Sequence, residues 1–259
     1  MKTFRVACLL GVMAWVAPVS ADDIIWDGGG ADNNWDTAEN WSNDVVPTFF
    51  ENVFFTSASS KDCVVTQNQV VFDFTMTAGY TGTLSSIGNP SLTIANDVSI
   101  EGGSISWPSN LSIMVERKLA VSGGSVTMTS RGVLVLGNTT ITGGTVDWRT
   151  AEFTGNVLIS GGSVTWGLGL HTFFGDYTHT GGSVTWAGGN TFLANYTRTG
   201  GTVNTMATDP VFNFSADAPQ TFTVGAGGIV LRQLRVDGGS SQVLDIIGDI
   251  TGPDGNFTF

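Results

Sequence analysis

The eight residues HTGGSVTW at positions 179–186 repeat, almost unchanged, the sequence ISGGSVTW at positions 159–166. Weaker copies lie on both sides. The first glycine of each pair recurs at intervals of 18–21 residues, at Gly102, Gly123, Gly143, Gly161, Gly181 and Gly200. The next pair in phase begins at Gly238, and we assign Pro219 and Gln220 to the intermediate corner. A fixed period of this length is the signature of a solenoid.

Each period contains three short segments in which apolar and polar residues alternate, as expected of half-buried strands. One follows the glycine pair, as SVTM does at residues 125–128, and we align TFTV at residues 221–224 with it. A second precedes the pair, and a third precedes the second. The sequence therefore predicts an all-β fold, a single-stranded parallel β-helix of about nine coils of ~20 residues, with right-handed winding. An antiparallel sandwich would not need like residues in register at every period.

Two kinds of turn should connect the strands. Glycine pairs permit a sharp bend without a clashing Cβ, which gives a structural role to Gly123, Gly124, Gly143, Gly144, Gly161, Gly162, Gly181 and Gly182. Five residues before each pair is a position occupied mostly by Asn or Asp, namely Asp97, Lys118, Asn138, Asn156, Asp176 and Asn195. We expect this column to form a hydrogen-bonded ladder, and we expect the glycines that often precede it (Gly137, Gly155 and Gly175) to adopt positive φ. Calcium bound between coils is the alternative, although the Ca²⁺-binding nonapeptide of β-rolls is absent.

Stacked coils place equivalent residues in columns. One column contains large apolar residues in phase with a neighbouring valine: Trp107, Met128, Trp148, Trp166, Trp186, Thr205 and Val224. We predict that it lies in the core, and an exposed ladder that stacks on sugar rings is the alternative. The opposite phase predicts outward columns of small polar residues, including the candidate binding ladder Thr127, Thr165, Thr185 and Thr223. This face is either a solvated strand surface or a recognition surface resembling the Thr-x-Thr arrays of ice-binding solenoids, with interruptions at Asp147 and Asn204.

The region before the repeats contains Trp26, Trp35 and Trp41 among Asp, Asn and Gly residues. Solenoids need a cap over the open end of their core, and three tryptophans could provide one. The alternative is a carbohydrate or metal site that uses Asp27, Asp32 and Asp36. We assign residues 22–68 to this cap and the first strands, and residues 69–259 to the repeats.

The first 21 residues have the features of a secretory signal: Lys2 and Arg5, an apolar run at residues 6–16, and small residues up to Ala21. No later stretch approaches the ~20 apolar residues of a membrane span. Without this segment the chain has 8 basic and 22 acidic residues, a balance of −14. Such a charge disfavours nucleic acid and anionic membranes as partners. Cys63 would be the only cysteine left, so we expect no intramolecular disulfide and a buried thiol.

A family resemblance is carried by the motifs WDGGG, NNW, AENW and NVFF, by the GG[ST]V repeats, and by LDIIGDITGPDGNFTF at residues 244–259. Together they resemble exported bacterial proteins with autotransporter-associated β-strand repeats. The resemblance implies a secreted or cell-surface β-solenoid, often part of a longer passenger, and it carries over no catalytic residue. Members usually continue into an anchoring or sorting module, so we expect the chain to be truncated at Phe259.

Catalytic constellations are hard to find. Asp147, Arg149 and Glu152 come from a single coil, and His171 and His179 lie on different strands, where we expect local bending to expose them. A catalytic or metal-binding histidine pair is the alternative. We therefore expect a non-catalytic secreted or cell-surface solenoid with a structural or adhesive role, no cofactor, and an extracellular glycan or another cell surface as partner. The alternatives are a carbohydrate-binding or pectate-lyase-like β-helix and an ice- or surface-binding Ser/Thr array.

Overall fold

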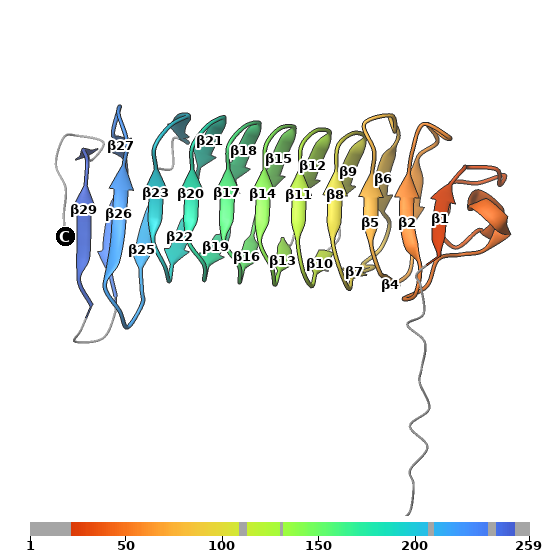
Figure 1. The fold of residues 1–259 in the computed structure, drawn as a ribbon, viewed down its shortest axis with the longest axis horizontal. Helices are drawn as coiled ribbons and strands as arrows, with labels where there is room; N and C mark the ends of the chain where they lie inside the picture. Colours follow the sequence, from red (N-terminus) through yellow and green to blue (C-terminus); the bar gives the residue numbers. More distant parts are fainter. Residues whose placement is uncertain (1–21, 109–112, 130–131, 207–209, 238–241, 252–259) are drawn as a thin grey trace, which may run out of the picture.

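The computed structural model describes residues 22–108, 113–129, 132–206, 210–237 and 242–251. The expected signal segment at residues 1–21, the corner at Gly238 and the expected truncation at Phe259 lie outside these residues. The described chain is all-β and winds into a β-solenoid of about nine turns of ~21 residues, as predicted. Short parallel strands stack side by side along a rod, with the Trp-rich region at one end (Figure 1).

Three parallel sheets run along the rod. Sheet A begins in the cap and consists of β1 (Asp23–Trp26), β2 (Asn52–Phe55), β5 (Phe74–Met76), β8 (Val98–Ile100), β11 (Leu119–Val121), β14 (Thr139–Ile141), β17 (Val157–Ile159), β20 (Tyr177–His179), β23 (Tyr196–Arg198), β26 (Gln220–Val224) and β29 (Leu244–Ile247). From β8 to β23 these strands precede the glycine pairs. Most strands of the sheet place alternate residues in the core, whereas β29 is only partly buried or exposed.

Sheet B follows the glycine corners and consists of β3 (Cys63–Val65), β6 (Thr83–Ser86), β9 (Ser104–Trp107), β12 (Ser125–Met128), β15 (Thr145–Trp148), β18 (Ser163–Trp166), β21 (Ser183–Trp186) and β24 (Thr202–Thr205). Sheet C completes each coil with β4 (Gln69–Val71), β7 (Leu92–Ile94), β10 (Ile113–Val115), β13 (Val133–Val135), β16 (Ala151–Phe153), β19 (Leu170–Phe173), β22 (Gly189–Phe192), β25 (Val211–Phe214) and β28 (Gln233–Val236). A two-stranded sheet pairs β27 (Ile229–Val230) with β30 (Ile250–Thr251).

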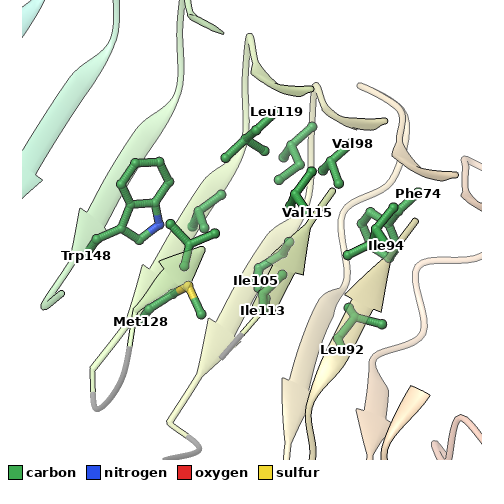
Figure 2. Close-up of a pocket in the computed structure, with 13 residues that line it drawn as sticks. Phe74, Leu92, Ile94, Val98, Ile105, Ile113, Val115, Leu119, Met128 and Trp148 are labelled. Atoms are coloured by element: carbon green, nitrogen blue, oxygen red, sulfur yellow. The ribbon is translucent and has the colours of Figure 1, made fainter. Parts of the chain in front are cut away.

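The core changes character along the rod. The coils around β7 to β13 are filled mainly by aliphatic side chains, with Trp107 of β9 as an exception, whereas the coils from β15 to β26 contain stacked aromatic rings. A cavity of about 20 Å³ lies in the aliphatic part and reaches Trp148 (Figure 2). Its lining consists of apolar residues only, and a water needs polar partners to occupy such a space. We therefore interpret this hollow as a small packing defect rather than a binding site.

The glycine corners are required sterically. The second glycine of each pair has a positive φ, for example +73° at Gly162 and +77° at Gly182. A Cβ on the first glycine would meet backbone of the preceding coil, as at Gly161, where it would lie 2.1 Å from the Thr142 oxygen. Our expectation of positive φ at the glycines before the Asn/Asp column was wrong for Gly137, Gly155 and Gly175. They too are glycines because the coil beneath leaves no room for a Cβ.

The cap contains β1 and two 3₁₀ turns, η1 (Ala38–Asn40) and η2 (Ser42–Asp44). Trp26, Trp35 and Trp41 are fully buried, which agrees with the prediction that they close the core. The Trp41 ring meets the other two edge-on, with centroid distances of 4.9 Å to Trp26 and 4.7 Å to Trp35. The Lys61 ammonium stabilises the loop that follows β1, because it donates hydrogen bonds to the carbonyls of Gly28 and Gly30.

Candidate functional site

The most regular surface of the molecule is the outer face of sheet B. In this sheet Thr127 pairs with Asp147, Asp147 with Thr165, Thr165 with Thr185, and Thr185 with Asn204. Three of the four residues of the candidate binding ladder therefore lie in one column, with the predicted interruption at Asp147. Burial raises the pKa of the Asp147 carboxyl.

A second polar column runs beside the first, two residues earlier in each strand, and consists of Ser104, Ser125, Thr145, Ser163, Ser183 and Thr202. Ser106 pairs with Thr127 and extends the first column by one coil, so six successive coils present two small polar side chains each. Neighbouring parallel strands are ~4.8 Å apart, so the groups form a two-column lattice on this face. The amide of Asn204 donates to the Ser183 hydroxyl at 3.2 Å, which links two coils of the lattice. We refer to the two columns together as the sheet B face.

The fourth residue of the ladder was placed wrongly. Thr223 lies on β26, which pairs with β23 in sheet A, so Thr223 stacks on Thr197. The register steps from His179 to Arg198 by 19 residues but from Arg198 to Val224 by 26. The turns on either side of β25 are longer than the corresponding turns around β16, β19 and β22. Extrapolation of a constant period therefore put Thr223 in the wrong sheet. Gln220, which we had assigned to a corner, begins β26.

The tryptophan column lies inside the molecule. Trp107, Trp148, Trp166 and Trp186 are all buried, and Met128 is buried in register between Trp107 and Trp148. This confirms the prediction of a core column and rules out an exposed sugar-stacking ladder made from these rings. Two assignments at the end of the column were inaccurate: Thr205 stacks on Trp186 but is only partly buried, and Val224 is buried in sheet A instead.

The Asn/Asp column forms the expected hydrogen-bonded ladder. The backbone N–H of Asn156 donates to Asn138 Oδ1 at 2.9 Å, Asp176 N–H to Asn156 Oδ1 at 2.9 Å, and Asn195 N–H to Asp176 Oδ1 at 3.1 Å. Each side chain thus holds the turn of the next coil. The described residues contain no group of three or more His, Cys, Asp or Glu side chains arranged to hold a metal ion.

The three aspartates of the proposed cap site do not converge. Asp32 accepts from the Asn34 backbone and the Thr37 hydroxyl, and these bonds lower the pKa of its carboxyl. Asp27 accepts from the Gly29 backbone. Asp36 accepts from the Gln69 amide, which belongs to the first repeat. Each carboxylate thus stabilises a separate turn or contact of the cap.

The two histidines are buried, so the expectation that bending exposes them was wrong. His171 lies inside sheet C with its Nε2 3.1 Å from the Trp148 carbonyl oxygen, and burial lowers its pKa to about 4. His179 lies inside sheet A beneath Arg198, and burial, followed by the charge of Arg198, lowers its pKa. They point into the core from different sheets and form no shared exposed site.

The charged residues of the coil around β15 are also dispersed. Asp147 faces outward from sheet B, and Glu152 faces outward from sheet C. Arg149 lies in the connecting turn and donates to the Thr129 carbonyl. Cys63 is buried in β3, as predicted, and burial raises the pKa of its thiol.

One surface feature was missed at the sequence level. Phe49 and Phe50 lie on an exposed turn of the cap, where their side chains are 46% and 58% exposed. The sequence signal was available in the flanking Thr48 and Glu51, which are spaced to bracket a turn. We had assigned this stretch only to the cap and the first strands, as part of residues 22–68.

Comparisons with protein-family models, with curated proteins and with solved structures gave no significant match. Among the described residues, no helix has the length and apolarity that crossing a bilayer requires. The fold and its surfaces are therefore the basis on which a function can be proposed.

Proposed function

We propose that this chain is a non-catalytic, exported β-solenoid with a structural or adhesive role, and that the sheet B face is its contact surface. The observation that carries this proposal is the in-register lattice of small polar side chains over six coils. A rigid periodic surface suits an extended, repetitive ligand, because each repeat of the ligand can meet an equivalent group. Export is supported by the features of residues 1–21 and by the family resemblance.

An extracellular glycan or another cell surface is the partner that fits this proposal best. The sheet B face offers hydroxyl donors and acceptors that can replace the water bound to a polar polymer. The acidic charge of the chain disfavours nucleic acid and anionic membranes.

A glycan array, repeated with and without millimolar calcium, tests this assignment. The variant T165K/T185K places two long charged side chains on the sheet B face. Its matched control is T178K/T197K, which places the same charges on the outer face of sheet A in the neighbouring strands β20 and β23. We expect glycan signal to fall at least about tenfold in the first variant and to stay within about twofold in the second. Equal losses, or release of sugar products during incubation, would contradict the proposal.

The lattice also supports a second candidate, an ice- or surface-binding array, because its hydroxyls repeat in register in two columns along sheet B. Thermal hysteresis measured on the wild type and on the same two variants separates the candidates. Hysteresis lost only in T165K/T185K, with no glycan signal, would favour ice over glycan.

A further inference from the structure

The exposed turn at Phe49 and Phe50 is a separate surface, at the cap end of the rod just before β2 (Figure 1). The Glu51 backbone N–H donates to the Thr48 carbonyl at 3.2 Å, which closes a four-residue turn. Glu51 Oε2 in return accepts from both the backbone and the hydroxyl of Thr48. The turn is therefore held at both ends by its own side chains.

The central positions of a tight turn usually carry Gly, Asn, Asp, Pro or Ser. Here they carry two phenylalanines, whose rings meet edge-on with centroids 5.2 Å apart. The structure buries the tryptophans of the cap and the aromatic rings of the core, yet leaves about half of each of these two rings in water. Such exposure does not stabilise the fold. Two adjacent exposed rings form a small apolar patch, and only larger patches mark a contact surface by size alone, so its surroundings must identify a partner.

The charge around the turn is one-sided. Residues 22–60 contain eight acidic residues and no lysine or arginine. Asp22 and Asp23 adjoin Asn52, immediately after the turn, through the Asp22 carbonyl and the Asp23 carboxylate. The nearest basic residue in the sequence, Lys61, directs its ammonium toward the cap loop and Asn40.

We propose that Phe49 and Phe50, with the carboxylates of Asp22 and Asp23 beside the turn, bind a short cationic and apolar peptide segment of a partner protein. An arginine side chain can stack its guanidinium on an aromatic ring while a nearby carboxylate balances the charge. The same charge repels an anionic membrane and a second copy of this acidic chain, and a neutral sugar would gain nothing from it.

The size of the surface also indicates a short segment. A phenylalanine buries about 150–250 Å² when fully covered, so covering the exposed halves of both rings removes ~200 Å² from water. A stable globular interface buries about 800 Å² on each partner. The turn therefore suits a few residues of an extended peptide. This inference concerns a different surface from the sheet B face and does not depend on its function.

The test uses fluorescence anisotropy with the labelled peptide RLRLRLRL, and with ELELELEL as its charge-reversed counterpart. The variant F49S/F50S removes both rings, and F174S is the matched control, because Phe174 is 43% exposed on a different turn that follows β19. We expect the double variant to bind the basic peptide at least about tenfold more weakly and F174S to stay within about twofold of wild type. The variant T165K/T185K should leave this binding unchanged.

Urea unfolding midpoints provide the folding control, since exposed Phe→Ser changes should leave them close to that of wild type. Equal binding of the basic peptide by wild type and F49S/F50S would overturn the proposal, because the rings would then contribute nothing and only the acidic charge of the chain would attract the peptide. The proposal would also be overturned if the two rings were needed for binding a neutral glycan or zwitterionic vesicles but not for binding the basic peptide.

Discussion

At the scale of single residues, the corners show two separable reasons for glycine. Gly162 has a φ of +73°, and a Cβ there would lie 2.6 Å from the Gly143 carbonyl oxygen of the preceding coil. Gly88 has a similar φ of +82° but nothing within 4 Å of its Cβ position. Gly155 has the close contact without the positive φ. These three positions allow the conformational and the steric contributions to be measured apart.

We predict that G88A lowers the free energy of unfolding by about 1–2 kcal/mol, the cost of left-handed backbone for a residue with a Cβ. G162A should cost roughly 2–5 kcal/mol, because overpacking against rigid backbone is added to that cost. Urea denaturation of the two variants measures both values. Equal losses in the two variants would mean that neighbouring coils move apart to accommodate the added methyl group, so that the close contact contributes nothing to the loss of stability.

His171 provides a pH test of burial. Its pKa in the folded protein is about 4, below the ordinary value of 6.5. Between these values the unfolded chain takes up a proton that the folded chain does not, so stability falls as the pH falls from 6.5 to about 4. The contribution of this residue amounts to at most about 3 kcal/mol.

The variant H171N, which copies the stacked Asn190 of the next coil, removes this titration. We expect the stability difference between pH 7 and pH 4.5 to be smaller in H171N than in wild type, as measured by urea unfolding at both values. His179 and the carboxylates titrate in both proteins, so their contributions cancel in the comparison. An unchanged pH dependence would show that His171 is not buried as a neutral base.

At the scale of elements, strand positions could be predicted wherever the coil period and the alternation of side chains agreed. Trp148, Trp166 and Trp186 satisfy both, and they stack in consecutive strands of sheet B. Thr223 was assigned to the wrong sheet because the length of a turn can change without any effect on the alternation of side chains within a strand. Turns lie on the outside of a solenoid, where their length is free to vary. His171 was misjudged because an inward polar residue can be satisfied by a backbone carbonyl, a partner that the sequence does not reveal.

Among the candidate sites, too, some features could be predicted from the sequence and others were missed. Thr127, Thr165 and Thr185 could be predicted to share a column because parallel stacking fixes their register. The exposure of Phe49 and Phe50 was missed, because Thr48 and Glu51 indicate a turn but aromatic residues in a cap are ordinarily assigned to its interior. Only the local turn geometry decides which way such rings point.

Trp166 tests the energetic role of the aromatic column. Its ring lies 5.6 Å from that of Trp186 in a stacked arrangement and 5.2 Å from that of Phe173 in a perpendicular one. We predict that W166A lowers the free energy of unfolding by roughly 3–5 kcal/mol. The control L168A, at a side chain that is largely exposed on the next turn, should cost less than about 0.5 kcal/mol. A loss below 1 kcal/mol in W166A, measured by chemical denaturation, would contradict the core assignment.

At the scale of the whole molecule, each coil contacts only its neighbours, so stability need not be uniform along the rod. The middle coils contain continuous stacks of rings, such as Phe153, Phe173 and Phe192 in sheet C. Near the end of the described chain, β28 and β29 expose apolar side chains, including Val236 and Ile247. Burial of apolar surface provides most of the stability of a coil, and the middle coils have the most of it.

We therefore predict a gradient of amide hydrogen exchange along the rod. Peptides that cover β17 to β21 should exchange at least about 100-fold more slowly than peptides that cover β28 and β29, because sub-global opening starts where the least apolar surface is buried. Exchange followed by mass spectrometry in wild type and W166A measures this gradient. W166A should speed exchange in the coils next to Trp166 while leaving the peptides of the Trp26–Trp41 cap unchanged. Uniform exchange, with equal acceleration everywhere, would instead mean that the solenoid opens as one cooperative unit.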